Sequence, residues 1–280
     1  MPTARSLGIA AVIAVAALSA ACSATSSSTS ATSTTQPAVP AGATYVALGS
    51  SYAAGIGIPA QSGGACARSS QNYPSLVAAK LELTLVDVSC SGATTANVLT
   101  TPQGTNPPQI DAVTSDTSLV TFTVGGNDIG YTATAVACGA QSAGCTSDPT
   151  QLSSDLTTLE RSLATLISTI HAKAPSAKIV LVTYPLLVPP TACPALDFTS
   201  QGDQVVGSMG QGLERVFTEV ATSTHVLLAD PYAIGASHGP CAAATESWTA
   251  GHTVTVGFPY HPTPLGHQEM AVLTEQALQR

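Results

Sequence analysis

The sequence predicts an α/β protein built on a parallel sheet with helices on both of its faces. Short apolar segments rich in valine, isoleucine and leucine alternate with longer segments whose leucines and isoleucines recur every three or four residues. Glycines, prolines and polar residues separate these segments, which places turns between them. Alternating strands and helices are typical of parallel sheets, because the connection between two parallel strands has to cross over the sheet.

Each element follows from its own pattern. Five segments have the apolar, β-branched composition of buried strands: 45–48, 83–88, 119–124, 178–183 and 225–229. Helical spacing predicts helices over 72–81, 151–173 and 201–222, and from Pro264 towards the C-terminus, with Thr263 as the N-cap. The helix over 201–222 is weakened by its glycines. Together these segments predict one folded domain over residues 44–280.

The N-terminal region reads as an export signal followed by a tether. Residues 1–21 carry Arg5 and then a short apolar run, which is the pattern of a signal peptide. The run leads into Cys22 through small residues, as in a bacterial lipobox, although the large apolar residue of that pattern is displaced by one position to Leu18. An ordinary secretory signal is the alternative. Residues 22–43 are rich in Ser, Thr, Ala and Pro and carry no charge, so we expect a disordered tether. The protein would therefore be exported, as a lipoprotein of the cell envelope or as a secreted protein.

Composition excludes one class of partner and favours disulfides. Charged residues make up only 9% of the 280 residues and the net charge is −8, so no basic surface is available to bind nucleic acid. Seven cysteines are present, and six remain once Cys22 is set aside for lipidation. An even number of cysteines in an exported chain suggests disulfide bonds, whose pairing the count alone does not decide. No cysteine or histidine cluster has zinc-like spacing, and we expect no metal or other cofactor.

A serine follows the first predicted strand at once. Residues 45–48 end at Gly49, and Ser50 and Ser51 come next. Active sites of open α/β sheets lie outside the carboxyl ends of the strands, so Ser51 is a candidate nucleophile. The alternative is an ordinary turn, because Gly-Ser-Ser after a strand is common in turns.

Serine hydrolysis also needs a base and donors for an oxyanion. Candidate donors follow the second and third strands: the backbone N–H of Gly92 and the side-chain amide of Asn127. Each position also fits a simple glycine turn before a helix. Among six histidines His261 is favoured as the base, because it lies in a loop fixed by Pro262 just before the last helix.

Four blocks occur in order along the chain: GSSYAAG, CSGATT, GGND and HPTPLGH. Together they resemble the blocks of the SGNH hydrolases, also called the GDSL esterase/lipase family, and most closely its secreted actinobacterial branch. The resemblance covers the whole folded domain. It implies a flavodoxin-like three-layer α/β/α sandwich with strand order 2-1-3-4-5. It also implies that Ser51 is the nucleophile, that His261 is the base, and that Ser51, Gly92 and Asn127 form the oxyanion hole.

The same branch has a pattern of three disulfides. Carried over to this chain, it implies the bridges Cys66–Cys90, Cys138–Cys145 and Cys193–Cys241.

Two positions depart from the family pattern. Ser50 stands where the family has an aspartate, and Phe258 stands where the acid of the triad is expected. No carboxylate lies between Glu246 and His261, so a local triad is excluded. Some members of the similar branch orient the histidine with a backbone carbonyl. We therefore predict a Ser51–His261 dyad in which the Phe258 carbonyl accepts the imidazole N–H.

The function implied by this resemblance is that of an exported serine esterase or lipase that works through an acyl-enzyme intermediate. We expect a monomer that acts on an ester-bearing lipid or an acylated glycan and touches the membrane only through a lipid on Cys22. Two alternatives stay open: a catalytically weak envelope lipoprotein that keeps the fold for binding, and an acyl-glycan deacetylase or acyltransferase.

Overall fold

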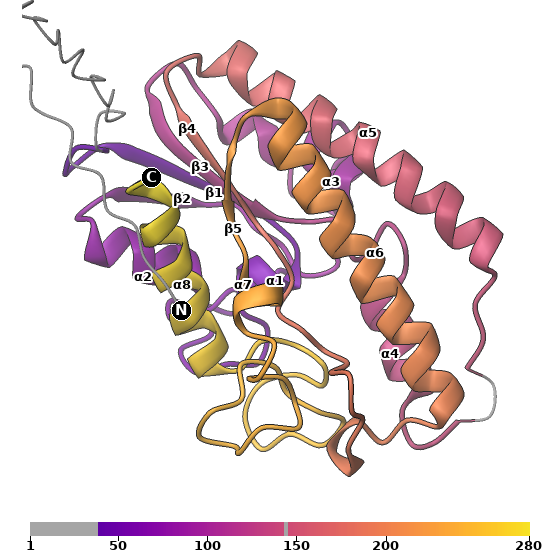
Figure 1. The fold of residues 1–280 in the computed structure, drawn as a ribbon. Helices are drawn as coiled ribbons and strands as arrows, with labels where there is room; N and C mark the ends of the chain where they lie inside the picture. The colour runs from indigo at the N-terminus through magenta and orange to yellow at the C-terminus, as the bar shows by residue number, and fades with distance from the viewer. Residues whose placement is uncertain (1–38, 143–144) are drawn as a thin grey trace, which may run out of the picture. The chain divides into compact units, whose positions relative to one another are not determined.

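Five parallel strands form the sheet at the centre of the fold (Figure 1). The computed structural model describes residues 39–142 and 145–280. The strands lie in the order β2-β1-β3-β4-β5, and all four neighbouring pairs are parallel, so the predicted order 2-1-3-4-5 is confirmed. Their bounds are β1 Thr44–Gly49, β2 Thr84–Asp87, β3 Thr117–Thr123, β4 Lys178–Val182 and β5 Leu227–Ala229.

Helices cover both faces of this sheet, which confirms the three-layer architecture. Val46 and Phe122 point into one core with α4 (Tyr131–Cys138), α5 (Pro149–Lys173) and α6 (Ser200–Thr224). Their neighbours along the strands point the other way, into a second core with α2 (Tyr73–Lys80) and α8 (Pro264–Leu278). This alternation is the two-residue period of a β-strand. In Figure 1 the two helical layers lie on opposite sides of the sheet.

The long helices begin and end close to the predicted positions. Thr263 accepts a hydrogen bond from Gly266 N, so the predicted N-cap of α8 is confirmed. The glycines of α6, which weaken its intrinsic helix propensity, have a packing role. A Cβ on Gly212 would lie 2.5 Å from Leu156 Cδ1 of α5, so glycine allows the two helices to approach closely.

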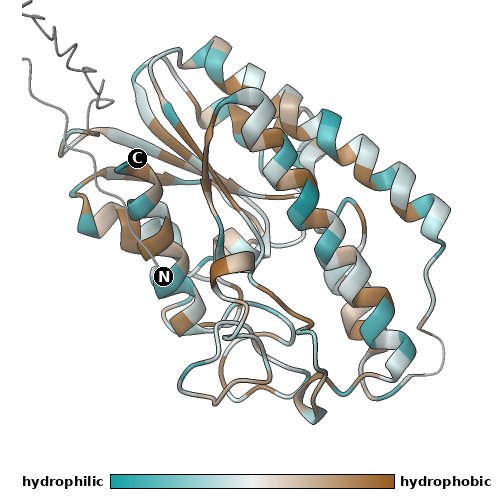
Figure 2. Ribbon diagram, viewed as in Figure 1, coloured by the Kyte–Doolittle hydropathy of each residue, from teal (hydrophilic) through white to brown (hydrophobic). Residues whose placement is uncertain are grey.

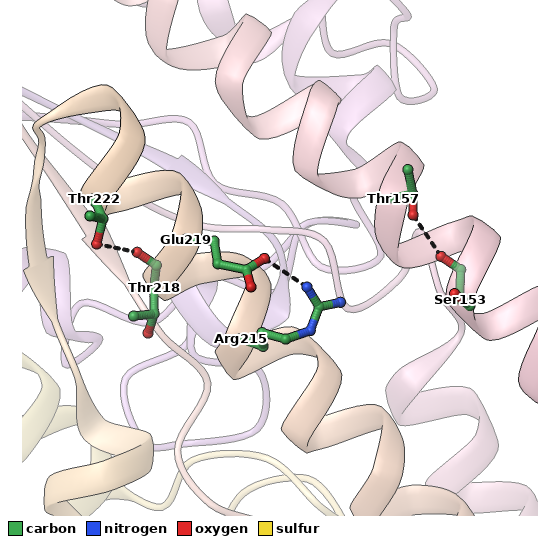
Figure 3. Close-up of polar contacts among 6 residues, drawn as sticks. All are labelled: Ser153, Thr157, Arg215, Thr218, Glu219 and Thr222. Atoms are coloured by element: carbon green, nitrogen blue, oxygen red, sulfur yellow. Dashed lines mark hydrogen bonds and ion pairs between the residues drawn. The ribbon is translucent and has the colours of Figure 1, made fainter.

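The outer faces of α5 and α6 are polar. Hydrophilic and hydrophobic residues alternate along both helices in Figure 2, as expected for helices with one buried side. On these faces, ion pairs and hydrogen bonds join residues that lie four positions apart in the same helix (Figure 3). Arg215 Nη1 lies 2.6 Å from Glu219 Oε2, and Thr157 Oγ1 donates to the Ser153 carbonyl at 2.9 Å. Such exposed pairs add little stability, so the buried faces hold the helices in place.

The sequence pattern does not predict α4 or the shorter elements. The shorter elements are α1 (Ser51–Ala54), α3 (Thr95–Leu99), α7 (Pro231–Ile234) and the 3₁₀ turns η1 (Gln109–Ala112) and η2 (Pro194–Leu196). They are too short for a helical period to show. Two of them lie at predicted site residues: α1 begins at Ser51, and α3 follows the loop that contains Gly92.

Three disulfides pair the cysteines as the family pattern implies. Cys66–Cys90, Cys138–Cys145 and Cys193–Cys241 are all present. The first joins the loop after α1 to the loop after β2. Among the described residues, no helix is long and apolar enough to cross a membrane. The expected signal peptide, Cys22 and most of the expected tether lie outside the described residues.

Candidate active site

Ser51 lies at the carboxyl end of the sheet. β1 ends at Gly49, Ser50 follows as the N-cap, and Ser51 is the first residue of α1. The sharp exit from β1 requires glycine, because Gly49 has φ +132° and a Cβ there would lie 2.6 Å from the Thr123 carbonyl oxygen of the neighbouring strand. The strand, the glycine and the helix start together fix the position of the serine.

The structure brings Ser51 and His261 together across 210 residues of sequence. Ser51 Oγ lies 2.8 Å from His261 Nε2. Both side chains are buried, Ser51 with 7% exposure and His261 with 4%. His261 lies in the loop that leads into α8, and this loop folds over the end of β1. A serine hydroxyl hydrogen-bonded to an imidazole is the arrangement needed to activate the serine as a nucleophile.

The other imidazole nitrogen of His261 is held by a backbone carbonyl, but not by the predicted one. His261 Nδ1 lies 2.9 Å from the Pro259 carbonyl oxygen. The prediction of Phe258 is therefore wrong by one residue. The Phe258 carbonyl accepts the backbone N–H of His261 at 3.2 Å. With Pro259 second and Tyr260 third at φ +60°, residues 258–261 have the hallmarks of a type II turn.

This turn explains why the carbonyl of Pro259, and not that of Phe258, accepts the imidazole N–H. Its closing hydrogen bond occupies the Phe258 carbonyl, so the next carbonyl along the chain faces the ring. When Nδ1–H donates to Pro259, the lone pair of Nε2 is free to accept the proton of Ser51.

Burial keeps the His261 ring neutral. Desolvation lowers the pKa of His261 to about 4, and the hydrogen bond to the Pro259 carbonyl offsets only part of this effect. Within the described ranges, no acidic side chain is hydrogen-bonded to either ring nitrogen. The imidazole is therefore a free base at neutral pH, ready to accept a proton.

Two backbone N–H groups at the site, those of Ser51 and Gly92, have no acceptor among the described residues. Ser51 opens α1, where an N–H has no partner within the helix. Gly92 follows β2, has φ +82° and is exposed. In the described part of the chain, neither N–H donates to another protein group. β2, β1 and β3 are neighbours, so these groups and the turn after β3 lie at the ends of adjacent strands.

Asn127, in the turn after β3, is fixed against the Gly92 loop. Its Nδ2 donates to the Ala93 carbonyl at 2.9 Å. An amide nitrogen has two hydrogens, so one N–H remains for a ligand. Next to it, the Asp128 carboxylate accepts the backbone N–H of Thr95 at 3.1 and 3.0 Å. Asp128 therefore ties the turn after β3 to the start of α3 and shapes the site without contacting the dyad.

Ser50 is directed away from the histidine. Its backbone N–H donates to the Thr123 carbonyl at 2.9 Å, and its Oγ lies 3.4 Å from the same oxygen. Although the two serines are adjacent in sequence, only Ser51 is paired with His261.

One supporting residue is not predicted by the sequence. The buried side chain of Gln109 in η1 forms two bonds with Gly49: Oε1 accepts the glycine N–H at 2.7 Å, and Nε2 donates to its carbonyl at 3.0 Å. These bonds pair the N–H and C=O of Gly49, as a neighbouring strand would, and so fix the end of β1. Gln109 lies 60 residues after Gly49 in the sequence, in a segment without a recognisable motif, so no sequence signal identifies it.

Known proteins share this fold and are similar to this chain in sequence. The model of the GDSL-like lipase/acylhydrolase family matches residues 47–269. Lipase 2 of Streptomyces coelicolor is 30% identical over 267 residues, which cover 86% of this chain and 89% of that lipase. The crystal structure of phospholipase A1 from Streptomyces albidoflavus NA297 has a TM-score of 0.72 and 29% identity, covering 85% of this chain and 100% of that one. The crystal structure of an extracellular lipase from Streptomyces rimosus has a TM-score of 0.70 and 28% identity, covering 84% of this chain and 99% of that one.

Fold and comparisons together define a carboxylic ester hydrolase with the SGNH hydrolase architecture. The chain belongs to the GDSL-like lipase/acylhydrolase family, as the four sequence blocks predict.

Proposed function

We propose that this enzyme hydrolyses esters with Ser51 as the nucleophile and His261 as the general base. The observation that carries the proposal is the 2.8 Å separation of Ser51 Oγ and His261 Nε2. Nε2 takes the hydroxyl proton while Oγ attacks the ester carbonyl carbon. The imidazolium then gives this proton to the leaving alcohol, which departs and leaves an acyl group on Ser51. Water, deprotonated by the same nitrogen, releases the acid and restores the serine.

The oxyanion of each tetrahedral intermediate would be held by the N–H groups of Ser51 and Gly92 and by the free N–H of Asn127. The two backbone N–H groups have no protein acceptor among the described residues, and the Asn127 amide is fixed in place by Ala93. Removing one donor of such a hole typically costs about 3–4 kcal/mol of transition-state stabilisation.

In this proposal the Pro259 carbonyl has the orienting role that a carboxylate has in a full triad. It lies 2.9 Å from Nδ1 and would fix the tautomer that leaves Nε2 free. A neutral carbonyl stabilises the imidazolium less than a carboxylate does, so the dyad would rely on exact placement of the ring.

A lipid ester is the substrate class that the surroundings favour. The loop before His261 exposes two apolar side chains, Val256 with 49% and Phe258 with 39% exposure, and the Phe258 ring stands edge-on to the imidazole at 5.1 Å. The apolar Phe258 ring beside the dyad would suit an acyl chain. The relatives described as lipases and phospholipase A1 support the same choice, and an acylated glycan is the second candidate.

The proposed location is outside the cytoplasm. The three disulfides favour an oxidising compartment. Residues 1–21 would act as the signal peptide, Cys22 would carry the lipid, and residues 22–43 would tether a monomeric domain. Secretion without a lipid is the alternative.

A binding role is the rival from another class. Ser50 in place of the family aspartate and the missing acid before His261 are the observations that favour it. An acyl-glycan deacetylase or acyltransferase would use the same residues on another substrate or acceptor.

An assay on p-nitrophenyl esters of several chain lengths and on acylated glycans tests the proposal. Ser51→Ala should reduce turnover at least about a thousandfold, because it removes the nucleophile. Ser50→Ala is the matched control and should retain activity within about tenfold, since its hydroxyl faces β3. If no substrate shows turnover that is lost in Ser51→Ala, the result would favour the binding protein.

A further inference from the structure

A second buried hydrogen bond runs beside the dyad. The hydroxyl of Tyr52 donates to the backbone carbonyl of Tyr260. Tyr52 follows Ser51, and Tyr260 precedes His261. The nucleophile helix and the histidine loop are therefore joined twice by adjacent residues, once through the dyad and once through the two tyrosines.

Tyr260 has a backbone conformation that its side chain disfavours. Its φ of +60° lies in the left-handed region, where a Cβ comes too close to the following carbonyl oxygen. Glycine usually occupies this third position of a type II turn. The surrounding contacts must therefore hold a tyrosine in it.

The ring end of Tyr260 is anchored by other parts of the chain. Its hydroxyl donates to the Leu196 carbonyl at 2.9 Å and lies 3.0 Å from His252 Nδ1. The ring stacks on Phe198 with centroids 5.1 Å apart and is fully buried. The backbone N–H of Tyr260 donates to Gly251 at 3.2 Å. These contacts fix the side chain, while Tyr52 fixes the carbonyl.

The conformation of Tyr260 decides where the histidine points. The left-handed turn closes the Phe258–His261 hydrogen bond and places the Pro259 carbonyl against Nδ1. If Tyr260 relaxed to an extended or right-handed conformation, the Pro259 carbonyl would rotate away from the ring. No carboxylate in the described chain would then replace it.

We propose that Tyr52 and Tyr260 form a clamp that positions His261 for Ser51, which compensates for the missing acid of the triad. The inference rests on the proposed roles of Ser51 and His261. Tyr52 suits this task because it is 1% exposed and its ring lies 4.8 Å from the imidazole and 4.5 Å from Tyr184. Burial raises the pKa of Tyr52 well above its usual value, so the hydroxyl stays protonated and remains a donor at any working pH.

Tyr52→Phe tests the clamp, since it removes one oxygen and keeps the ring contacts. We expect kcat per active site to fall about 10- to 100-fold with KM changed less than about twofold, because a misplaced base slows both chemical steps. Tyr131→Phe is the matched control. Tyr131 belongs to the same buried aromatic cluster, but its hydroxyl faces α6 at Gly210, and we expect kcat within about twofold of the wild type.

Active-site titration with a fluorophosphonate separates positioning from folding. A purely structural effect would lower the fraction of titratable sites and leave the rate per site unchanged. Positioning predicts a nearly full complement of sites that each turn over slowly. In a Ser51→Ala background, Tyr52→Phe should reduce the residual rate no further.

Tyr260→Phe probes the other end of the clamp. If Tyr52→Phe does not fold, this variant alone tests whether the clamp positions His261. We expect it to lower kcat per site about three- to tenfold, because the ring loses its anchors on Leu196 and His252. Per-site rates at the wild-type level in whichever of the two variants folds would overturn the clamp and leave the proposed function intact. Failure of the wild type to show turnover that depends on Ser51 would instead overturn the proposed function, and the clamp with it.

Discussion

The two halves of the proposed dyad are held by different means. Ser51 lies on a regular unit, the end of β1 and the start of α1, and its neighbours are fixed by the sheet and by Gln109. His261 lies at the end of residues 235–263, which form no helix or strand. A few specific contacts from distant parts of the chain hold it. The serine side should therefore share the stability of the core, whereas the histidine side should lose function through small changes that leave the fold intact.

Asn127→Ala tests the sheet side and has the largest expected effect in this comparison. The substitution removes one donor of the proposed oxyanion hole and the bond to Ala93. We expect kcat to fall about 10²- to 10³-fold, with KM nearly unchanged, because the donor acts on the transition state. Steady-state kinetics on a short p-nitrophenyl ester measures this change. A decrease of less than about tenfold would remove Asn127 from the hole.

The pH dependence of kcat/KM tests the histidine side. His261 has to be neutral to accept the serine proton, and burial lowers its pKa to about 4. Activity should therefore persist well below the ordinary histidine pKa of about 6.5 and decline only as the pH approaches 4. A decline centred near 6.5 or above would show that the ring is solvated or paired with a charge, contrary to the carbonyl-held geometry.

The same shift predicts a loss of stability in acid. The unfolded chain binds a proton at His261 at higher pH than the folded chain does, so stability is full above about 6.5 and falls as the pH decreases towards 4. His267, whose pKa burial lowers to about 3, adds to this effect. Denaturant unfolding in the Ser51→Ala variant across this pH range separates loss of stability from loss of catalysis.

Phe258→Ala has the smallest expected effect on kcat, and it tests whether the Pro259 carbonyl alone orients His261. The substitution removes an exposed ring but keeps the backbone turn in which the Pro259 carbonyl faces Nδ1. On a short ester kcat should change less than about threefold, while KM for a long-chain ester should rise. Loss of most activity on the short ester, with the fold intact by circular dichroism, would mean that the ring itself positions the histidine.

The same contrast explains what the sequence predicts and what it does not. The strand order, the pairing of Ser51 with His261 and the three disulfides are predicted from the family resemblance, and the N-cap at Thr263 from a local pattern. The acceptor for His261 is mispredicted by one residue because it depends on φ at Tyr260, and tyrosine gives no signal for a left-handed conformation. Gln109 and Tyr52 are missed as supporting residues for a different reason. Their partners lie 60 and 208 residues away, and a single sequence does not show such pairs.

The central claim is that Ser51, activated by His261, carries the acyl group. Trapping the enzyme with a fluorophosphonate and mapping the modified peptide by mass spectrometry tests this most directly. We predict one adduct per chain, on Ser51, with labelling abolished in Ser51→Ala, retained in Ser50→Ala and strongly slowed in His261→Ala. An adduct on Ser50, or labelling at the wild-type rate without His261, would contradict the account.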